Sequence, residues 1–302
     1  MSDVARLRLP SEIGQIVDLV ERRFAEAAER NAYFNGEIDR ADLIAAYQRA
    51  ASPPWVVERD GVLVGHLYGA TSPSPNSPAV WTGPDGYSFT TPEDLRALLT
   101  VARRSWLQAG VTTHNVWVPI ASGTSAWLAE GYDVVSVRAS RAVPQSTIVP
   151  TMAFRSATEA DFAVAVAFDD FIDIAQGEPP SERSAQQQEE VETIIHELIT
   201  DPDVNYIFLE IDGVPIGQFV TMEAPRIRGT HEHVSLLSSF AVAPAFRRRG
   251  LGRAMVNAAL HFAALAGAEY LDVRYRTYNE GGSNFWQSVG FTPVLAQLTT
   301  LI

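Results

Sequence analysis

Three consecutive arginines and two glycines form the most informative segment of the sequence, Arg247-Arg-Arg-Gly-Leu-Gly252. An apolar strand pattern, Val234–Val242, precedes it, and Pro244 ends that strand because proline has no N–H to donate to a sheet. A helical pattern follows at once. The N-terminus of a helix carries partial positive charge, and glycines let a ligand approach the backbone closely. We therefore expect this turn to bind a pyrophosphate group.

The expected helix, 250–266, has one apolar face. Its apolar residues are spaced alternately by four and three, which predicts burial of Leu251, Met255, Ala258, Phe262 and Leu265. The opposite face carries Arg253, Asn257 and His261.

The pattern Val242-x-Pro244-x-x-Arg247-x-x-Gly250-x-Gly252 resembles the acetyl-CoA signature of the GCN5-related N-acetyltransferase (GNAT) superfamily. A second motif of that family, Asn…Leu-Tyr…Gly-Phe, is similar to a downstream set of five residues, Asn279, Phe285, Trp286, Gly290 and Phe291. The chain is identified by this resemblance as a tandem member whose layout is similar to that of mycothiol synthases.

The resemblance implies an α/β fold (an α+β mixed sheet) with two tandem domains, each a central mixed sheet flanked by helices. It implies acetyl-CoA as co-substrate and transfer of its acyl group to a primary amine that attacks the thioester directly. The implied coenzyme-binding residues are Phe240, Ala241, Val242, Arg247, Arg248, Arg249, Gly250, Leu251, Gly252, Arg253, Asn279, Phe285 and Trp286.

The resemblance also implies a role for each group of these residues. Backbone N–H groups of Arg248 to Arg253 would hold the pyrophosphate. The segment Phe240–Val242 would pair like a strand with the pantetheine arm, and one of its N–H groups would stabilise the thioester oxyanion. Asn279 would lie beside the pantetheine arm.

Two positions depart from the family pattern. Trp286 stands where relatives often have the tyrosine that protonates the leaving thiolate, and an indole is no useful acid. Leu236 stands where some relatives carry a glutamate base. The candidate catalytic residues are therefore Glu232, His233, Ser239 and Tyr278, with His231, Ser238 and Tyr275 as alternatives. Solvated or structural roles stay open for each of them.

No metal site is expected. His231 and His233 would share one strand face, but the sequence offers no third ligand beside them. The absence of cysteine excludes thiolate ligands, cysteine nucleophiles and disulfides, and it fits a cytoplasmic location.

Two halves of the chain share one order of elements. In each, an N-terminal strand and helix precede a hairpin, a long helix, a strand and a short helix that ends in Gly-aromatic. The expected domains are 1–145 and 151–302, joined by a linker at 143–151. The long helix of the first half begins Thr91-Pro-Glu-Asp94, which caps it with acids and leaves no Arg-x-x-Gly-x-Gly motif. We expect that first domain to be degenerate and to bind no acetyl-CoA.

Charge and composition restrict the partners. A net charge of −13 argues against general nucleic-acid binding, and the sequence contains no apolar run long enough to span a membrane. The acidic second half favours a small-molecule or peptide amine that is cationic, with Asp169, Asp170 and Asp173 as possible contacts unless they form a solvated face. The alternative function is an acyl-CoA sensor without turnover. The sequence gives no indication of the oligomeric state.

Overall fold

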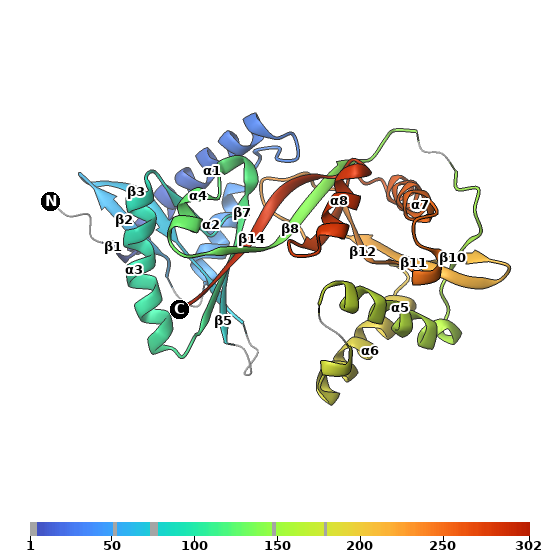
Figure 1. Cartoon of the computed structure of the whole chain (residues 1–302). Coiled ribbons are helices and arrows are strands. Elements are labelled where there is room, and N and C mark those ends of the chain that lie inside the picture. Colours follow the sequence, from blue (N-terminus) through green and yellow to red (C-terminus); the bar gives the residue numbers. More distant parts are fainter. Residues whose placement is uncertain (1–4, 51–52, 73–77, 147–148, 178–179) are drawn as a thin grey trace. The chain divides into compact units, whose positions relative to one another are not determined.

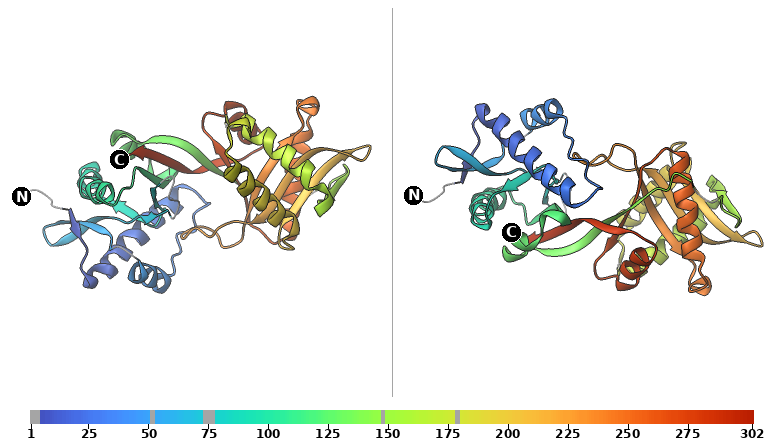
Figure 2. Two further views of the ribbon diagram at one scale, coloured as in Figure 1. Left: turned by 90° about the horizontal axis from the view of Figure 1, so that it is seen from below. Right: turned by 90° about the horizontal axis from the view of Figure 1, so that it is seen from above.

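The computed structural model describes residues 5–50, 53–72, 78–146, 149–177 and 180–302, so parts of the expected linker (147–148) and of a long loop (73–77) lie outside the described residues. The chain forms two compact units. The first comprises 1–137, 226–231 and 293–302, and the second comprises 138–225 and 232–292. Figures 1 and 2 show the elements of both.

Helices of the first unit surround two groups of strands. Its helices are α1 (Ile13–Arg30), α2 (Arg40–Arg49), α3 (Pro92–Gln108) and α4 (Ser125–Ala129). Its strands are β1 (Ala5–Leu7), β2 (Trp55–Arg59), β3 (Val62–Leu67), β4 (Ala70–Thr71), β5 (Ala79–Thr82), β6 (Tyr87–Phe89) and β7 (Thr113–Pro119). One sheet has the order β1-β2-β3-β6. Strand β7 pairs in parallel with β5 and antiparallel with the last strand of the chain, β14 (Thr292–Leu301).

Strand β8 (Asp133–Ala142) begins in the first unit and ends in the second. The helices of the second unit are α5 (Phe162–Ala175), α6 (Ala185–Thr200), α7 (Leu251–Leu265) and α8 (Glu280–Ser288). Its further strands are β9 (Phe154–Ser156), β10 (Asn205–Ile211), β11 (Val214–Glu223), β12 (Val234–Val242) and β13 (Tyr270–Arg276). The order is β13-β12-β11-β10-β9, with β12 and β13 parallel and the remaining pairs antiparallel.

Helices cover both faces of the second unit's sheet. Figure 1 shows α5 and α6 on one face of β10, β11 and β12, and α7 on the other, and the two views of Figure 2 agree. Side chains alternate between these faces. Phe208 packs with Phe168 of α5, whereas Phe219 packs with Phe262 of α7. The sheet is therefore buried on both sides.

The two units repeat one hairpin. The β2–β3 turn, Asp60-Gly61, has φ values of 51° and 78°, and the β10–β11 turn, Asp212-Gly213, has 51° and 76°. A β-bulge lies at the same place in each, between Val57 and Glu58 and between Leu209 and Glu210.

An ion-pair triad is repeated as well. In each unit an arginine of the first strand binds an acid at the start of the first helix and an acid of the second strand. The members are Arg6, Glu12 and Glu58 in one unit, and Arg155, Asp161 and Glu210 in the other. These shared details confirm the tandem α/β fold.

One part of the predicted burial of α7 is wrong. Met255 and Ala258 are fully buried, but Leu265 is 72% exposed. Leu265 is the last residue of α7, just before the turn at Gly267, so it no longer lies against the sheet.

Candidate functional site

A β-bulge interrupts β12 near its end. Gln218 of β11 pairs with Ala241, and Val220 pairs with Ser238, so Phe219 alone lies opposite two residues of β12. One of these two, Ser239, has φ of 43°, a left-handed conformation that is uncommon for a non-glycine residue. The bulge changes the direction of the strand just before Phe240.

Strands β12 and β13 separate beyond the middle of their lengths. Their parallel pairing joins Val234–Leu237 to Tyr270–Val273. In the described structure no registered pair follows, although β12 continues to Val242 and β13 to Arg276. Backbone groups of Phe240–Val242 on this edge are therefore in position to pair with an extended ligand.

The turn between β12 and α7 has an unusual backbone. A short 3-10 turn, Pro244–Phe246, follows β12, and both Arg248 and Gly250 are left-handed, with φ of 60° and 80°. In the part of the chain that the structure describes, no side chain caps the N-terminus of α7. Its first N–H groups are consequently available to an anion.

The arginines of this turn mostly hold the turn itself. Arg247 Nε donates to the carbonyl oxygen of Val242 at 2.9 Å, and Arg249 Nη2 donates to that of Ala245 at 2.9 Å. Arg253 Nη2 donates to the carbonyl oxygen of Ser288 at 3.3 Å, which ties α7 to α8. Their positive charges stay beside the N-terminus of α7.

Aromatic side chains connect the end of β12 to α8. The ring of Phe240 lies 4.9 Å from Trp286 and 5.8 Å from Phe285, centroid to centroid. Trp286 also contacts Phe291 at 5.3 Å. Asn279 caps α8, because its Oδ1 accepts from the N–H of Gly282 at 2.9 Å.

The candidate catalytic residues fall into two separate groups. Glu232 and His233 are exposed and precede β12, whereas Ser239 lies at the bulge near its other end. At ~3.3 Å per residue, roughly 20 Å of strand separates His233 from Ser239. Tyr278 lies between β13 and α8 and is 56% exposed. Glu232 and His233 therefore lie at the opposite end of β12 from the bulge.

A polar cluster that the sequence only partly suggested lies on the α5 face. Arg183 is 8% exposed, and its guanidinium contacts Asp169, Asp170 and Asp173 of α5. The three acids therefore do not form a simple solvated face. Gln218 was not among the predicted site residues. The sequence feature that could have identified it is a single amide side chain within the apolar strand segment Ile216–Val220.

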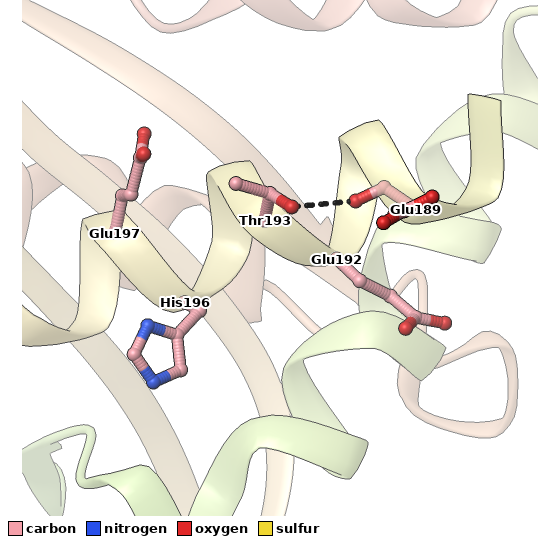
Figure 3. Close-up of a pocket in the computed structure, with 5 residues that line it drawn as sticks. All are labelled: Glu189, Glu192, Thr193, His196 and Glu197. Carbon is pink, nitrogen blue, oxygen red and sulfur yellow. Dashed lines mark hydrogen bonds between the residues drawn. The ribbon is translucent and has the colours of Figure 1, made fainter. Parts of the chain in front are cut away.

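A second surface feature lies on α6. Figure 3 shows the five residues that line a pocket there, Glu189, Glu192, Thr193, His196 and Glu197. All five side chains belong to this one helix, and Thr193 Oγ1 donates to the carbonyl oxygen of Glu189 at 2.8 Å. The pocket includes no residue of β12, α7 or α8.

Among the described residues no group of three or more His, Asp or Glu is arranged to hold a metal ion. Likewise, no described helix is long and apolar enough to cross a membrane.

Comparisons with known proteins agree with this geometry. Residues 168–291 match the model of the acetyltransferase (GNAT) family. Residues 168–291, in the second half of the chain, are therefore similar to the acetyltransferase domain of the GNAT family.

Solved structures show the same fold over the whole chain. A GCN5-related N-acetyltransferase from Sphaerobacter thermophilus has a TM-score of 0.62 at 14% identity, covering 99% of this chain and 95% of that one. A tandem GNAT protein from the clavulanic acid biosynthesis pathway has a TM-score of 0.53 at 17% identity, with 99% and 98% covered. A GNAT-family acetyltransferase from Colwellia psychrerythraea has 0.52 at 11%, with 99% of both covered. A comparison with curated proteins finds no significant match.

Proposed function

We propose that the second unit is an N-acyltransferase that moves an acetyl or other acyl group from coenzyme A to a primary amine. The observation that carries this proposal is the N-terminus of α7. Its N–H groups lack a side-chain cap among the described residues, and the left-handed Arg248 and Gly250 turn the preceding backbone toward the same place. Such a concave group of N–H donors fits a pyrophosphate.

The separated strands support the same proposal. The pantetheine arm would pair with Phe240–Val242 on the edge of β12 that β13 leaves. An N–H group of this segment would donate to the thioester oxygen as negative charge develops there. The amine nitrogen would then attack the thioester carbon, and coenzyme A would leave as a thiolate.

We further propose that the first unit binds no coenzyme. In that unit α3 begins at Pro92, directly after β6 ends at Phe89, so the described segment between them has no counterpart of the turn 244–250. The N-terminus of α3 is occupied by a capping box of Thr91 and Asp94. Asp94 also binds Arg59 at 2.6 Å and would repel a phosphate.

Calorimetric titration of acetyl-CoA tests this function. We expect one coenzyme per chain and loss of binding in Gly250→Asp, because the new carboxylate would occupy the anion position. Gly267→Asp is the matched control, since Gly267 has φ of 75° and lies beyond the other end of α7. A Cβ atom added to either glycine would meet no heavy atom of the described residues within 4 Å. Equal affinities in the wild type and Gly250→Asp would refute the site.

The alternative function, an acyl-CoA sensor, is favoured by Trp286 and Leu236, which replace an acid and a base of the family pattern. Measuring coenzyme A release with a panel of primary amines separates the two functions. Release that depends on the amine supports the transferase, whereas binding without release supports the sensor.

A further inference from the structure

Three aspartates of α5 surround one arginine whose side chain is only 8% exposed. Arg183 Nη2 lies 3.3 Å from Asp169 and 2.5 Å from Asp173, and its Nη1 lies 3.0 Å from Asp170. Gln188 Oε1 also accepts from Nη1 at 3.1 Å. One guanidinium does not balance three carboxylates, so the cluster retains negative charge and attracts a cation.

Asp169 is the least exposed acid of this cluster, with a side chain that is 21% exposed. Its neighbour Phe168 packs with Ala241 of β12 and with Tyr206 of β10 in one core. The Asp169 charge also acts on Tyr206, since it raises the pKa of that phenol further after burial has raised it. Asp169 and the Tyr206 hydroxyl therefore belong to one polar region on the α5 face.

Gln218 completes that region and is not satisfied within it. The residue is fully buried, and its Oε1 accepts from Tyr206 Oη at 3.0 Å. Its Nε2 has no hydrogen-bond partner among the described residues. A buried donor without an acceptor is costly, so a ligand atom that accepts a hydrogen bond from Nε2 would be favoured here.

The position of Gln218 connects this region to the reaction. It pairs in register with Ala241, within the segment that we assign to the thioester. It lies on the same face as Tyr206 and Val220, which is the face that α5 covers. An acceptor bound between Asp169 and Gln218 would thus approach β12 from the α5 side.

We propose, on the basis of the function proposed above, that Asp169 binds the ammonium group of the acceptor and takes its proton, while Gln218 Nε2 donates to an oxygen atom of the same acceptor. The proton moves from nitrogen to the Asp169 carboxylate. The freed nitrogen pair forms the new C–N bond, and the C–S bond breaks with its electron pair on sulfur. The nitrogen then loses its second proton to the thiolate, and the proton held by Asp169 passes to water.

The electrostatics of the cluster suit a base. Burial raises the pKa of Asp169 most, the charges of Asp173 and Asp170 raise it further, Arg183 lowers it, and the result is about 6. A carboxyl group with this pKa is ionised at neutral pH and is a stronger base than an ordinary aspartate. The cluster also selects the substrate class: a primary amine that carries a hydrogen-bond-accepting oxygen and no negative charge.

The first experiment measures kcat/KM for acetyl-CoA with 2-methoxyethylamine from pH 5 to pH 9. We expect Asp169→Asn to lose at least about 100-fold at pH 7 and to lose the acidic limb of the profile near pH 6. Asp203→Asn, which removes an exposed carboxylate outside the cluster, should stay within about twofold. Acetyl-CoA calorimetry on Asp169→Asn should show wild-type affinity, which establishes that the variant is folded.

The second experiment compares 2-methoxyethylamine with butylamine. We expect the wild type to prefer the oxygen-containing amine and Gln218→Leu to lose this preference. Activity of Asp169→Asn within threefold of the wild type, or an unchanged preference in Gln218→Leu, would overturn the inference about these two residues. Neither result would contradict the proposed transferase function. Coenzyme binding without turnover of either amine would overturn the transferase function and the inference with it.

Discussion

Gly252 and Phe285 are packed so closely that a methyl group on Gly252 would push the Phe285 ring away by a few tenths of an ångström. An ideal Cβ on Gly252 would lie 3.1 Å from two ring carbons of Phe285. The first turn of α7 and the side of α8 are therefore set against each other at the proposed pyrophosphate site. This contact favours a glycine at position 252 because of the limited space, whereas Gly250, with φ of 80°, is favoured because of its backbone conformation.

Replacing Gly252 by alanine should weaken coenzyme binding by about tenfold, because Phe285 and the start of α7 must move apart. Overpacking of this kind costs roughly 1–3 kcal/mol of unfolding free energy. Urea unfolding and acetyl-CoA calorimetry measure the two effects. The double variant Gly252→Ala/Phe285→Leu should recover part of both, and the absence of any recovery would contradict the steric explanation.

A buried ion pair in the second unit should be sensitive to the loss of one partner. Arg138 Nε donates to Asp272 Oδ2 at 2.5 Å, and the Asp272 side chain is fully buried. Arg138→Met should cost about 3 kcal/mol in urea unfolding, because it leaves a carboxylate in the interior without this guanidinium.

An ion pair with an exposed arginine supplies the control for that measurement. Arg96 and Glu130 lie 2.9 Å apart, with side chains that are 61% and 11% exposed. Arg96→Met should cost less than ~1 kcal/mol, since solvent screens the pair. Equal losses in the two variants would mean that burial does not control the strength of the Arg138–Asp272 pair.

Much of this architecture could be predicted from sequence because it follows from local signals. Ser184 begins α6 with a capping box, and Asp212-Gly213 closes a hairpin. The glycine turn before α7 follows from residue types alone. These features depend on a few neighbouring residues, so periodicity and turn chemistry are sufficient to find them.

The bulge and the polar cluster could not be predicted in the same way. Ser239 is left-handed although its type gives no sign of it, because the conformation arises from the pairing of β12 with β11. Arg183 reaches Asp169 because the 3-10 turn Pro180–Glu182 that precedes it contacts α5. Such contacts join residues of different secondary-structure elements, so local sequence patterns do not predict them and the three-dimensional structure is needed.

The two units differ at one matching position of their repeated hairpins. His66 of β3 stands where Gln218 stands in β11, and it is fully buried, with Tyr47 Oη at 2.8 Å and Ser88 Oγ at 2.7 Å. Burial, with a smaller contribution from Arg23, lowers the pKa of His66 to about 3. The histidine therefore stays neutral in the folded chain under ordinary conditions.

His66 should make the first unit sensitive to acid. Its folded pKa lies below the unfolded value of about 6.5, so its contribution to stability is full above pH 6.5 and is lost as pH falls toward 3. The loss amounts to about 2 kcal/mol between pH 8 and pH 5. Thermal unfolding of His66→Gln should depend less on pH over this range, and an unchanged pH dependence would contradict this explanation.

Asp169 should make the stability of the second unit depend on pH in the opposite direction, with lower stability at high pH. Because burial and its acidic neighbours raise its pKa to about 6, above the ordinary value of 3.8, the folded chain holds this proton more tightly than the unfolded chain does. The stabilisation is present below pH 3.8 and is lost as pH rises through 6. At pH 8 the ionised, half-buried carboxylate is therefore a net cost.

Asp169→Asn, which carries no charge at any pH, removes this cost. We expect the variant to gain stability relative to the wild type as the pH is raised from 5 to 8, by about 1 kcal/mol once partial solvent exposure is allowed for. Asp203→Asn should show no such trend. Urea unfolding of the three proteins at pH 5 and pH 8 measures the difference, and it needs no substrate. A variant that loses stability toward pH 8 would show that attraction to Arg183 outweighs burial, in which case Asp169 is an ion-pair partner and not a base.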